Sequence, residues 1–415
     1  MRDSNDTTRS GESVPKQPGR GEFIVLIALM ISIVAMAIDA MLPALGQIGE
    51  DMGVAGGNRQ QLVVTFLFLG LAFSQIVFGP LSDSFGRKPV IYAGFIIFMI
   101  GCVMSIVATS FWVMLAGRLL QGIGAAGPRI VTLALVRDRF GGREMAQLMS
   151  LVMTVFILIP VFAPIVGQGI MMVTHWRGIF VMFLVLAAIA FVWFWVRQPE
   201  TLAPEKRSKL SAGRIARAFR ETLTNRTALG YTVTAGLIFG AFIGYLVSAQ
   251  QIFQVTFGVG EAFPLYFAVS AGALGFASIT NARLVMRFGM RPLTGVALAA
   301  ASLLSIVFLV VVVLAGNHPS LWATMVYIVV TFFFVGFVFG NFNALAMEPL
   351  GHIAGSASSV IGSVTLLISL ALGTLIGQLY DGTVLPLVAG FAVLATVSFA
   401  VMMWVERTLP WNAQD

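Results

Sequence analysis

Long apolar segments fill most of the chain and are separated by short polar ones. Each segment has roughly the 20 residues that an α-helix needs to cross the hydrocarbon core of a bilayer. The pattern therefore predicts an all-α membrane protein with twelve transmembrane helices. They are expected at 23–48, 60–81, 89–108, 111–136, 146–172, 176–197, 228–256, 262–282, 292–315, 320–347, 354–380 and 383–405.

The longest polar interruption divides these helices into two sets of six. Within it, Ile215, Phe219 and Leu223 recur at helical spacing between arginines. This pattern is typical of an amphipathic helix on the membrane surface, and a solvated linker helix would show it as well. The predicted domains are a tail at 1–22, a half at 23–197, the linker at 198–227, a second half at 228–405 and a tail at 406–415. The first tail has no apolar stretch of the kind that a signal peptide contains.

The composition excludes several classes of protein. Hydrophobic residues make up 58% of the chain and charged residues 10%, whereas soluble domains have roughly 45–50% and about 25%. A cytosolic enzyme, a disordered protein and a secreted disulfide scaffold are thereby excluded. The net charge of +7 comes from lysines and arginines that lie between the apolar segments, so it does not indicate a nucleic-acid partner.

Most of the 25 lysines and arginines fall in the tails, in the linker and in loops on the same predicted side. The loops on the other side contain only Arg59 and Arg177. Because cytoplasmic loops are enriched in these residues, the pattern predicts that both termini are cytoplasmic.

The two halves repeat each other. Residues 85–89 (FGRKP) follow the second predicted helix, and 288–292 (FGMRP) follow the eighth. Gly167-Gln168 in the fifth helix is matched by Gly377-Gln378 in the eleventh. Duplicated halves in a membrane enclose a binding site near the midplane and rock about it.

Several motifs resemble those of the major facilitator superfamily. Residues 79–89 (GPLSDSFGRKP) resemble its signature loop, and 118–122 (RLLQG) a motif of the fourth helix. Residues 160–167 are similar to the antiporter motif, although Ala163 and Gln168 depart from it. Within the superfamily, the motifs at Asp39 to Pro43, Trp176 to Phe180, Glu200 to Leu202 and 354–359 are similar to those of the Bcr/CflA drug:proton antiporters.

The resemblance covers residues 22–407 and implies two pseudo-symmetric six-helix halves. It implies proton-coupled efflux of drugs or other amphiphilic small molecules by alternating access. The expected location is the bacterial cytoplasmic membrane, and the expected partners are the substrate, protons and lipid, with no cofactor or metal. We expect a monomer.

The resemblance also gives roles to two groups of residues. The signature loop would form a conformational latch from Gly79, Asp83, Gly86, Arg87 and Lys88. The alternative is simple anchoring by positive charge, which does not account for Asp83. The bend formed by Pro160, Pro164 and Gly167 would block leak during exchange, although generic kinking by proline also explains it.

Asp39 is the only acidic residue placed deep in a predicted helix. An intramembrane carboxylate is costly and usually functional, and burial disfavours its charged form. Asp39 can therefore take up and release a proton. Arg118 falls at the same depth, so a facing pair is expected, and the family motif implicates this arginine in proton coupling. A purely structural ion pair remains the alternative.

Other polar residues in the predicted helices are candidates for a substrate cavity. Arg129 lies on the same helix face as Arg118 and would suit an anionic group, or it would reach toward the inner interface. Uncharged groups would either line the cavity or form hydrogen bonds to neighbouring helices: Gln121, Tyr245, Gln251, Asn341 and Asn343. Gly236, Gly240 and Gly244 have the spacing of a helix-packing motif.

Two other functions are alternatives. A transporter of one defined metabolite uses the same fold, and Arg129 would suit an anion. A membrane enzyme needs a nucleophile with a base, or a metal cluster. The chain has the single cysteine Cys102, and its histidines, His175, His318 and His352, fall in loops without the spacing of metal ligands. The sequence therefore predicts a transporter and not an enzyme.

Overall fold

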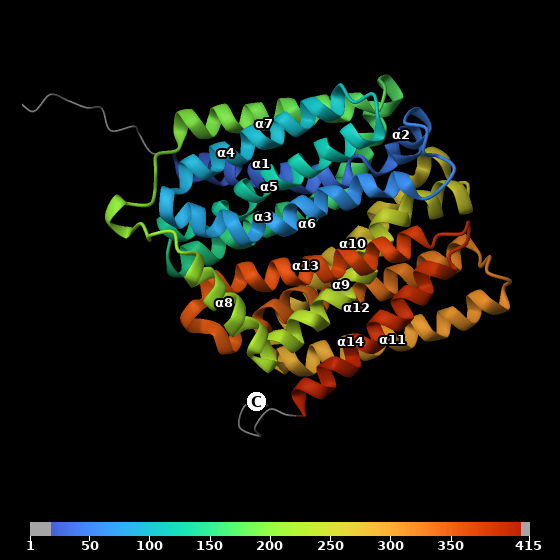
Figure 1. Cartoon of the computed structure of the whole chain (residues 1–415). Helices are drawn as coiled ribbons and strands as arrows, with labels where there is room; N and C mark the ends of the chain where they lie inside the picture. The colour runs from blue at the N-terminus through green and yellow to red at the C-terminus, as the bar shows by residue number, and fades with distance from the viewer. Residues whose placement is uncertain (1–17, 408–415) are drawn as a thin grey trace, which may run out of the picture.

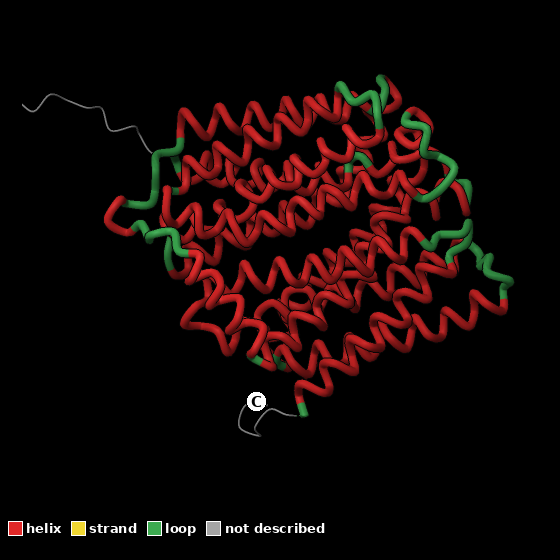
Figure 2. The backbone as a smooth tube through the Cα atoms, viewed as in Figure 1, coloured by secondary structure: helices red, strands yellow, loops and turns green. Residues whose placement is uncertain are grey.

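The computed structural model describes residues 18–407, apart from the side chains of Arg143, Ala146, Ser150, Met153, Phe156, Ile157 and Ala212. The predicted tails at 1–22 and 406–415 lie largely outside the described residues. Within residues 18–407 every regular element is a helix, as Figure 2 shows.

Both halves consist of long helices joined by short connections. The N-terminal half contains α1 (Arg20–Asp39), η1 (Leu42–Ala44), α2 (Leu45–Asp51), η2 (Arg59–Gln61), α3 (Leu62–Phe85), α4 (Arg87–Ile106), α5 (Phe111–Arg139), α6 (Gly142–Val173) and α7 (Arg177–Arg197). The linker contains η3 (Pro204–Lys206) and α8 (Ala212–Thr224). The C-terminal half contains α9 (Arg226–Gln250), the π-helical turn η4 (Gln251–Thr256), η5 (Gly260–Ala262), α10 (Phe263–Phe288), α11 (Met290–Leu314), α12 (Leu321–Met347), η6 (Glu348–Ile353), α13 (Ala354–Gln378) and α14 (Leu385–Glu406).

The predicted number of membrane helices is confirmed. In the described part of the chain, 10 helical segments are long and apolar enough to cross a bilayer. One of them, Leu321–Gln378, contains both α12 and α13, and α6 contributes the shorter apolar helix Leu158–Val173. Counting α12 and α13 as two helices and adding α6 gives twelve membrane helices in the described part of the chain. The helix α8 is not counted because it belongs to the linker.

The two halves lie side by side, and α8 lies at one end of the bundle (Figure 1). We call this the linker end and the opposite one the distal end. Across the halves, α3 packs against α13 and α6 packs against α10. We call this contact surface the seam.

Small residues allow close packing within each half. On α9, Gly236, Gly240 and Gly244 face the side chains of α13, and a Cβ at Gly244 would lie 2.9 Å from Ile376. The packing role that the spacing predicts for these glycines is confirmed.

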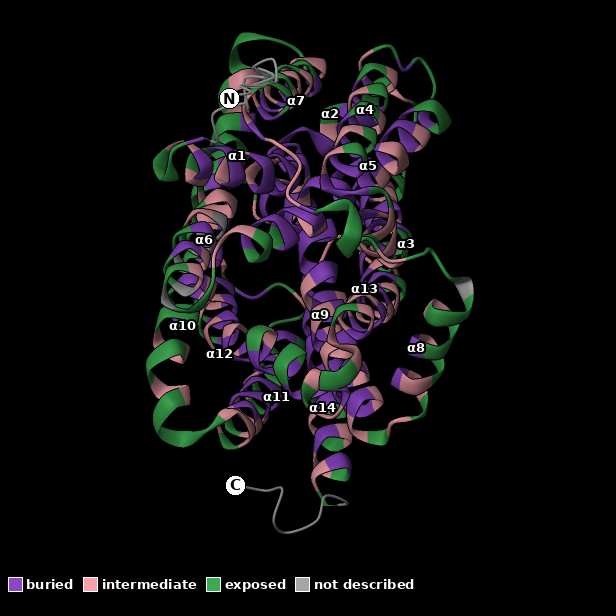
Figure 3. Ribbon diagram, turned by 90° about the vertical axis from the view of Figure 1, so that its left-hand side faces the viewer, coloured by how far each residue is buried: buried purple, intermediate pink, exposed green. Residues whose placement is uncertain are grey.

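The linker helix α8 packs on the protein itself. Ala218 and Thr222 are buried, and α8 contacts α13 and α9 of the C-terminal half. Ile215 and Ala218 border a small gap that is also lined by Ile76 of α3 and Ser359 of α13. Figure 3, viewed from the linker end, shows α8 beside α13. The apolar stripe of α8 therefore faces protein, which neither alternative for this helix had anticipated.

Candidate functional site

Asp39 lies where the first transmembrane helix breaks. It is the last residue of α1, and the chain continues through the 3₁₀ turn η1, which contains Pro43. Proline lacks the backbone N–H that a continuing helix needs. The side chain is 5% exposed. Its carboxyl group makes no hydrogen bond or ion pair with another described residue, so this buried acid has no protein partner to stabilise its charged form.

The expected facing pair of Asp39 and Arg118 is not formed among the described residues. The guanidinium of Arg118 is fully buried and donates instead to two backbone carbonyls, from Nη2 to Ala37 at 2.8 Å and from Nε to Val63 at 3.0 Å. Because α1 ends two residues after Ala37, that carbonyl lies in the last turn, where helical partners are missing. Arg118 thus holds the end of α1 against α3 and α5. The depth of Arg118 along its helix does not distinguish these contacts with backbone carbonyls from an ion pair with Asp39.

Gln121 belongs to the same structural network. Its side-chain oxygen accepts from Nη1 of Arg118 at 2.6 Å, and its amide donates to the carbonyl of Gly101 and to Ser105. Both ends of the amide are therefore occupied within the N-terminal half, which leaves no free group of Gln121 for a ligand.

Tyr245 occupies the corresponding position in the other half. Asp39 and Tyr245 lie equally far from Arg20 and Arg226, where the first helices of the two halves begin. Tyr245 is buried, and its ring packs edge-on against Phe332 with ring centroids 4.7 Å apart. Its hydroxyl has no hydrogen-bond partner of ordinary geometry among the described residues. Asp39 is close enough to interact with Tyr245 electrostatically.

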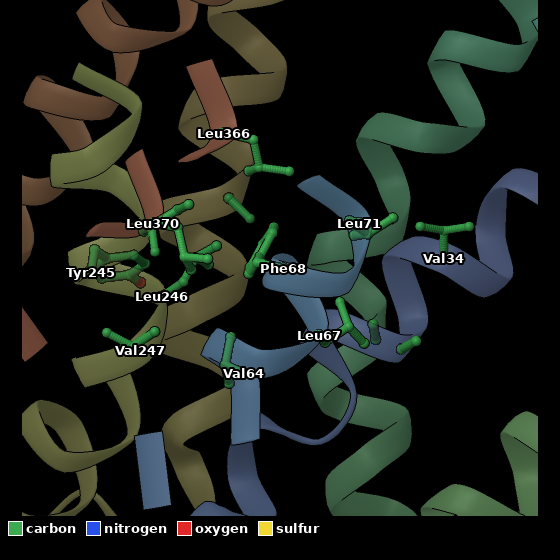
Figure 4. Close-up of a cluster of buried hydrophobic side chains, with 14 of the residues drawn as sticks. Val34, Val64, Leu67, Phe68, Leu71, Tyr245, Leu246, Val247, Leu366 and Leu370 are labelled. Carbon is green, nitrogen blue, oxygen red and sulfur yellow. The ribbon is translucent and has the colours of Figure 1, made fainter. Parts of the chain in front are cut away.

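Apolar side chains close the seam between these positions. Figure 4 shows side chains of α3 converging on side chains of α9 and α13. They are Val64 and Phe68 on one side and Leu246, Val247, Leu366 and Leu370 on the other, whereas Leu67 and Leu71 of α3 face their own half. The middle of the seam is therefore apolar and closely packed.

A polar network joins the halves at the distal end. Asn58 donates to the carbonyls of Gln378 at 2.9 Å and Tyr380 at 2.7 Å. Gln251 donates to the Asn58 side chain at 2.8 Å and accepts from the amide of Gln61. We call these five residues the distal network. Gln251 was expected in the cavity and instead lies in this network.

Sequence analysis missed the other four members of the distal network as a group. Their only signal was polarity at helix ends, together with the repeated Gly377-Gln378 pair. Between the two halves, every hydrogen bond described for residues 18–407 falls at the distal end or in the middle of α3. The innermost is the bond from Ser363 to the carbonyl of Ala72 at 2.8 Å.

Arg129 has no partner among the described residues. It is partly buried within the span formed by α5, and it makes no hydrogen bond, ion pair or ring contact there. The two asparagines of α12 differ from each other. Asn341 exchanges hydrogen bonds with Asn281 of α10, at 2.9 and 3.2 Å, and so bridges two helices. Asn343 is exposed near the linker end.

The signature loop forms a charge cluster within the N-terminal half. Arg87 is buried and bonds to Asp83 at 2.5 Å and to Asp138 of α5 at 2.9 Å. The carboxylate of Glu200 accepts the backbone N–H groups of Arg87 and Lys88, both at 3.0 Å, at the start of α4. A negative charge is favourable at a helix N-terminus. Asp138 and Glu200 were not assigned to this cluster from sequence.

Two glycines of the loop have different geometric roles. Gly86 adopts a φ of +105° between α3 and α4, and a Cβ there would lie 2.6 Å from Glu200. Gly79 lies at the seam, where a Cβ would be 3.1 Å from Ser359 of α13. The loop thus ties α3, α4, α5 and the linker together, and it meets the other half at Gly79 and at Pro80, which borders a small gap with Ser359 of α13.

The antiporter-like segment packs directly behind Asp39. Pro160 and Pro164 lie inside α6, and a Cβ at Gly167 would lie 1.7 Å from the carbonyl oxygen of Ala40. Only glycine permits this approach of α6 to the end of α1. Among the described residues, no three His, Cys, Asp or Glu side chains gather as a metal site.

Duplicated helical halves, with a buried acid that has no partner in the described part of the chain, define a secondary transporter of the membrane. The chain belongs to the Major Facilitator Superfamily, which its sequence matches over residues 26–374. It is therefore a multi-pass transporter of small molecules and not an enzyme.

The chain is 31% identical over 392 residues to the bicyclomycin resistance protein homolog of Haemophilus influenzae, covering 93% of this chain and 96% of that protein. It is 28% identical over 316 residues to the multidrug transporter MdfA of Yersinia pestis, covering 74% of each. These relatives support the resemblance to drug-resistance transporters.

Solved structures share the fold. A bacterial homolog of the human lysosomal transporter Spinster, in an inward-facing and occupied conformation, has a TM-score of 0.72 at 16% identity, covering 95% of this chain and 98% of that one. The human organic anion transporter MFSD10 has a TM-score of 0.65 at 19% identity, covering 94% and 99%. The predicted two-half architecture is confirmed.

Proposed function

We propose that the protein is a proton-coupled exporter of drugs or other amphiphilic small molecules. The observation that carries this proposal is Asp39, a buried acid at the end of α1 that has no partner among the described residues. An unpaired carboxyl group in a low-dielectric site can hold a proton when buried and release it when water or a ligand arrives. This exchange is the minimum chemistry that coupling requires.

Arg118 contributes by position in this mechanism. It holds the carbonyl of Ala37 and thereby fixes the end of α1 on which Asp39 lies. Movement of α1 during the transport cycle would then alter the surroundings of Asp39. The arginine thus couples proton exchange to helix position without being a proton carrier.

Alternating access would proceed by opening the distal network and the apolar seam while the linker end closes. The distal network consists of neutral hydrogen bonds, which contribute only about 0.5–1.5 kcal/mol each. Such bonds can break and reform at modest cost. The Gly79 contact at the linker end, beside the charge cluster of the signature loop, would mark the opposing latch.

The proposed orientation follows from charge. The linker end carries Arg87, Lys88 and the arginines of α8, and such residues favour the cytoplasmic side. Both termini would be cytoplasmic, in the inner membrane of a bacterium, and inward proton flow would drive efflux. One proton charge is worth about 2.3 kcal/mol per 100 mV. We propose that the transporter acts as a monomer.

The proposal is tested in proteoliposomes by proton release on addition of a panel of unrelated drugs. Wild type should respond to several of them and should move a responsive drug against its gradient when a pH gradient is imposed. Asp39→Asn should still bind that drug but lose uphill transport. Glu50→Gln, an exposed acid in the same first span, is the matched control and should keep both activities. Normal pumping by Asp39→Asn would refute the coupling assignment.

A further inference from the structure

Arg129 lies inside the membrane-spanning part of the protein and has no counter-charge among the described residues. The other arginine of the α5 interior, Arg118, donates a hydrogen bond from each of its three guanidinium nitrogens, whereas Arg129 has no partner among the described residues. A lone arginine in a membrane helix is costly and usually functional. This contrast on one helix indicates that Arg129 is kept free for something that is not part of the chain.

The side chain of Arg129 faces the interior of the protein. It lies three helical turns from Arg118 and therefore on the same face, which Arg118 turns toward α1 and α3. Exposure varies along this face. Arg118 and Ala125 are buried, Arg129 is partly buried, Leu133 is 36% exposed and Val136 is buried again. Arg129 and Leu133 thus form an accessible stretch between buried positions of the same face.

Aromatic side chains of the C-terminal half lie at a similar depth. Phe239 of α9 and Phe339 of α12 pack edge-on with centroids 5.2 Å apart, and Phe242 contacts both. All three are partly buried. At 1.5 Å per residue, Arg129 lies about 15 Å from the linker end of its helix, Phe339 about 12 Å and Phe239 about 20 Å.

Asp39 is too deep to be the missing counter-charge. By the same rise per residue it lies about 28 Å from the linker end of α1, and it forms no ion pair with Arg129 in the described residues. Asp39 and Arg129 therefore lie at different depths in the membrane. Asp39 can exchange a proton while Arg129 holds a ligand.

We propose that Arg129 binds the anionic group of the transported molecule, whose apolar body rests against Phe239, Phe242 and Phe339. This inference rests on the proposed export function and specifies its substrate class as amphiphilic anions with a carboxylate or a similar group. A guanidinium recognises such groups with paired, charge-assisted hydrogen bonds. The same charge rejects cationic drugs.

The experiment compares three matched probes on the purified full-length protein: 2-naphthoate, its methyl ester and 2-naphthylmethylammonium. Binding is measured by thermal-shift titration. Wild type should bind the carboxylate at least about tenfold more tightly than the ester, because the ester lacks the charge. The ammonium probe should bind most weakly. Equal affinities for the carboxylate and the ester in wild type would overturn the proposal.

Variants test whether Arg129 causes the preference for the carboxylate probe over the ester. Arg129→Gln should weaken carboxylate binding at least about tenfold and leave ester binding unchanged, while Arg129→Lys, which keeps the charge, should restore part of the preference. Arg137→Gln, at the exposed end of the same helix, is the control and should behave as wild type. An unchanged preference in Arg129→Gln would also overturn the proposal.

Proton release in vesicles distinguishes this inference from the function on which it rests. Asp39-dependent release on addition of the ester, without any preference for the carboxylate, would overturn the Arg129 assignment alone. Absence of release with every probe and every drug of the panel would overturn the export function itself.

Discussion

Two arginines on one face of α5 show how the surroundings decide what a side chain does. Arg118 meets carbonyls of α1 and α3 and becomes a structural clamp. Arg129 meets no described partner and keeps its hydrogen-bonding capacity. The sequence placed both correctly within a span, but the partners of an arginine depend on which carbonyls the neighbouring helices leave unpaired.

Gly167 is the residue at which packing leaves least room. Gly167→Ala would place a Cβ 1.7 Å from the carbonyl oxygen of Ala40, so α6 or the end of α1 must move. We expect a lower unfolding temperature in detergent and loss of transport. Gly169→Ala, on the same helix with open space around it, should be close to wild type in both measurements. Equal behaviour of the two variants would contradict the packing argument.

At the scale of elements, the ends of helices position several of the residues proposed to be functional. The break after α1 presents Asp39, and the start of α4 is held by a carboxylate from the linker. Both depend on backbone groups that a helix cannot satisfy at its termini. The signature loop is therefore as much a helix cap as a charge cluster.

Glu200→Gln should weaken the cap of α4. The amide retains one acceptor oxygen but loses the charge that favours a helix N-terminus, so we expect a loss of about 0.5–1 kcal/mol. The measurement is thermal unfolding followed by tryptophan fluorescence. Glu205→Gln, an exposed linker acid, should leave the midpoint unchanged. A midpoint unaffected by Glu200→Gln would show that the cap contributes no stability.

The elements themselves were largely predictable, because the thickness of the bilayer sets the length of a membrane helix and its hydrocarbon core requires apolar side chains. The predicted helix at 111–136 is observed at Phe111–Arg139, and the one at 228–256 at Arg226–Gln250 with η4. The contacts between elements were not predictable from one chain. The partners of Arg118, the docking of α8 and the distal network all depend on helix rotation and on residues far apart in sequence.

At the scale of the whole molecule, the halves have diverged from a common plan. Corresponding positions hold an acid in one half and a phenol in the other, at Asp39 and Tyr245. In the N-terminal half the membrane interior contains Asp39, Arg118 and Arg129, whereas the described C-terminal half offers aromatic rings. The division suits a transporter in which one half handles charge and the other holds apolar surface.

The distal network should control how often that end opens. The double variant Gln61→Ala with Gln251→Ala removes hydrogen bonds across the halves worth about 0.5–1.5 kcal/mol each. The population of the open state should rise roughly fivefold or more. Gln254→Ala, whose hydrogen bonds stay within the C-terminal half, is the control.

Distances between spin labels measure this opening. Thr109→Cys and His318→Cys place labels on distal loops of the two halves, in a Cys102→Ser background. The double variant should shift the distance distribution to longer values, and the control should not. An unshifted distribution would show that the apolar seam alone keeps the distal end closed.

The linker is fastened to both halves close to its middle. The N–H of Ser208 donates to the carbonyl of Asp83 in the first half, while α8, capped by Ser211, is docked on the second. The intervening residues 209–211 can extend by at most about 10 Å. This short segment limits how far the halves can separate at this end. Any wider separation must first break the hydrogen bond between Ser208 and Asp83 or detach α8 from the second half.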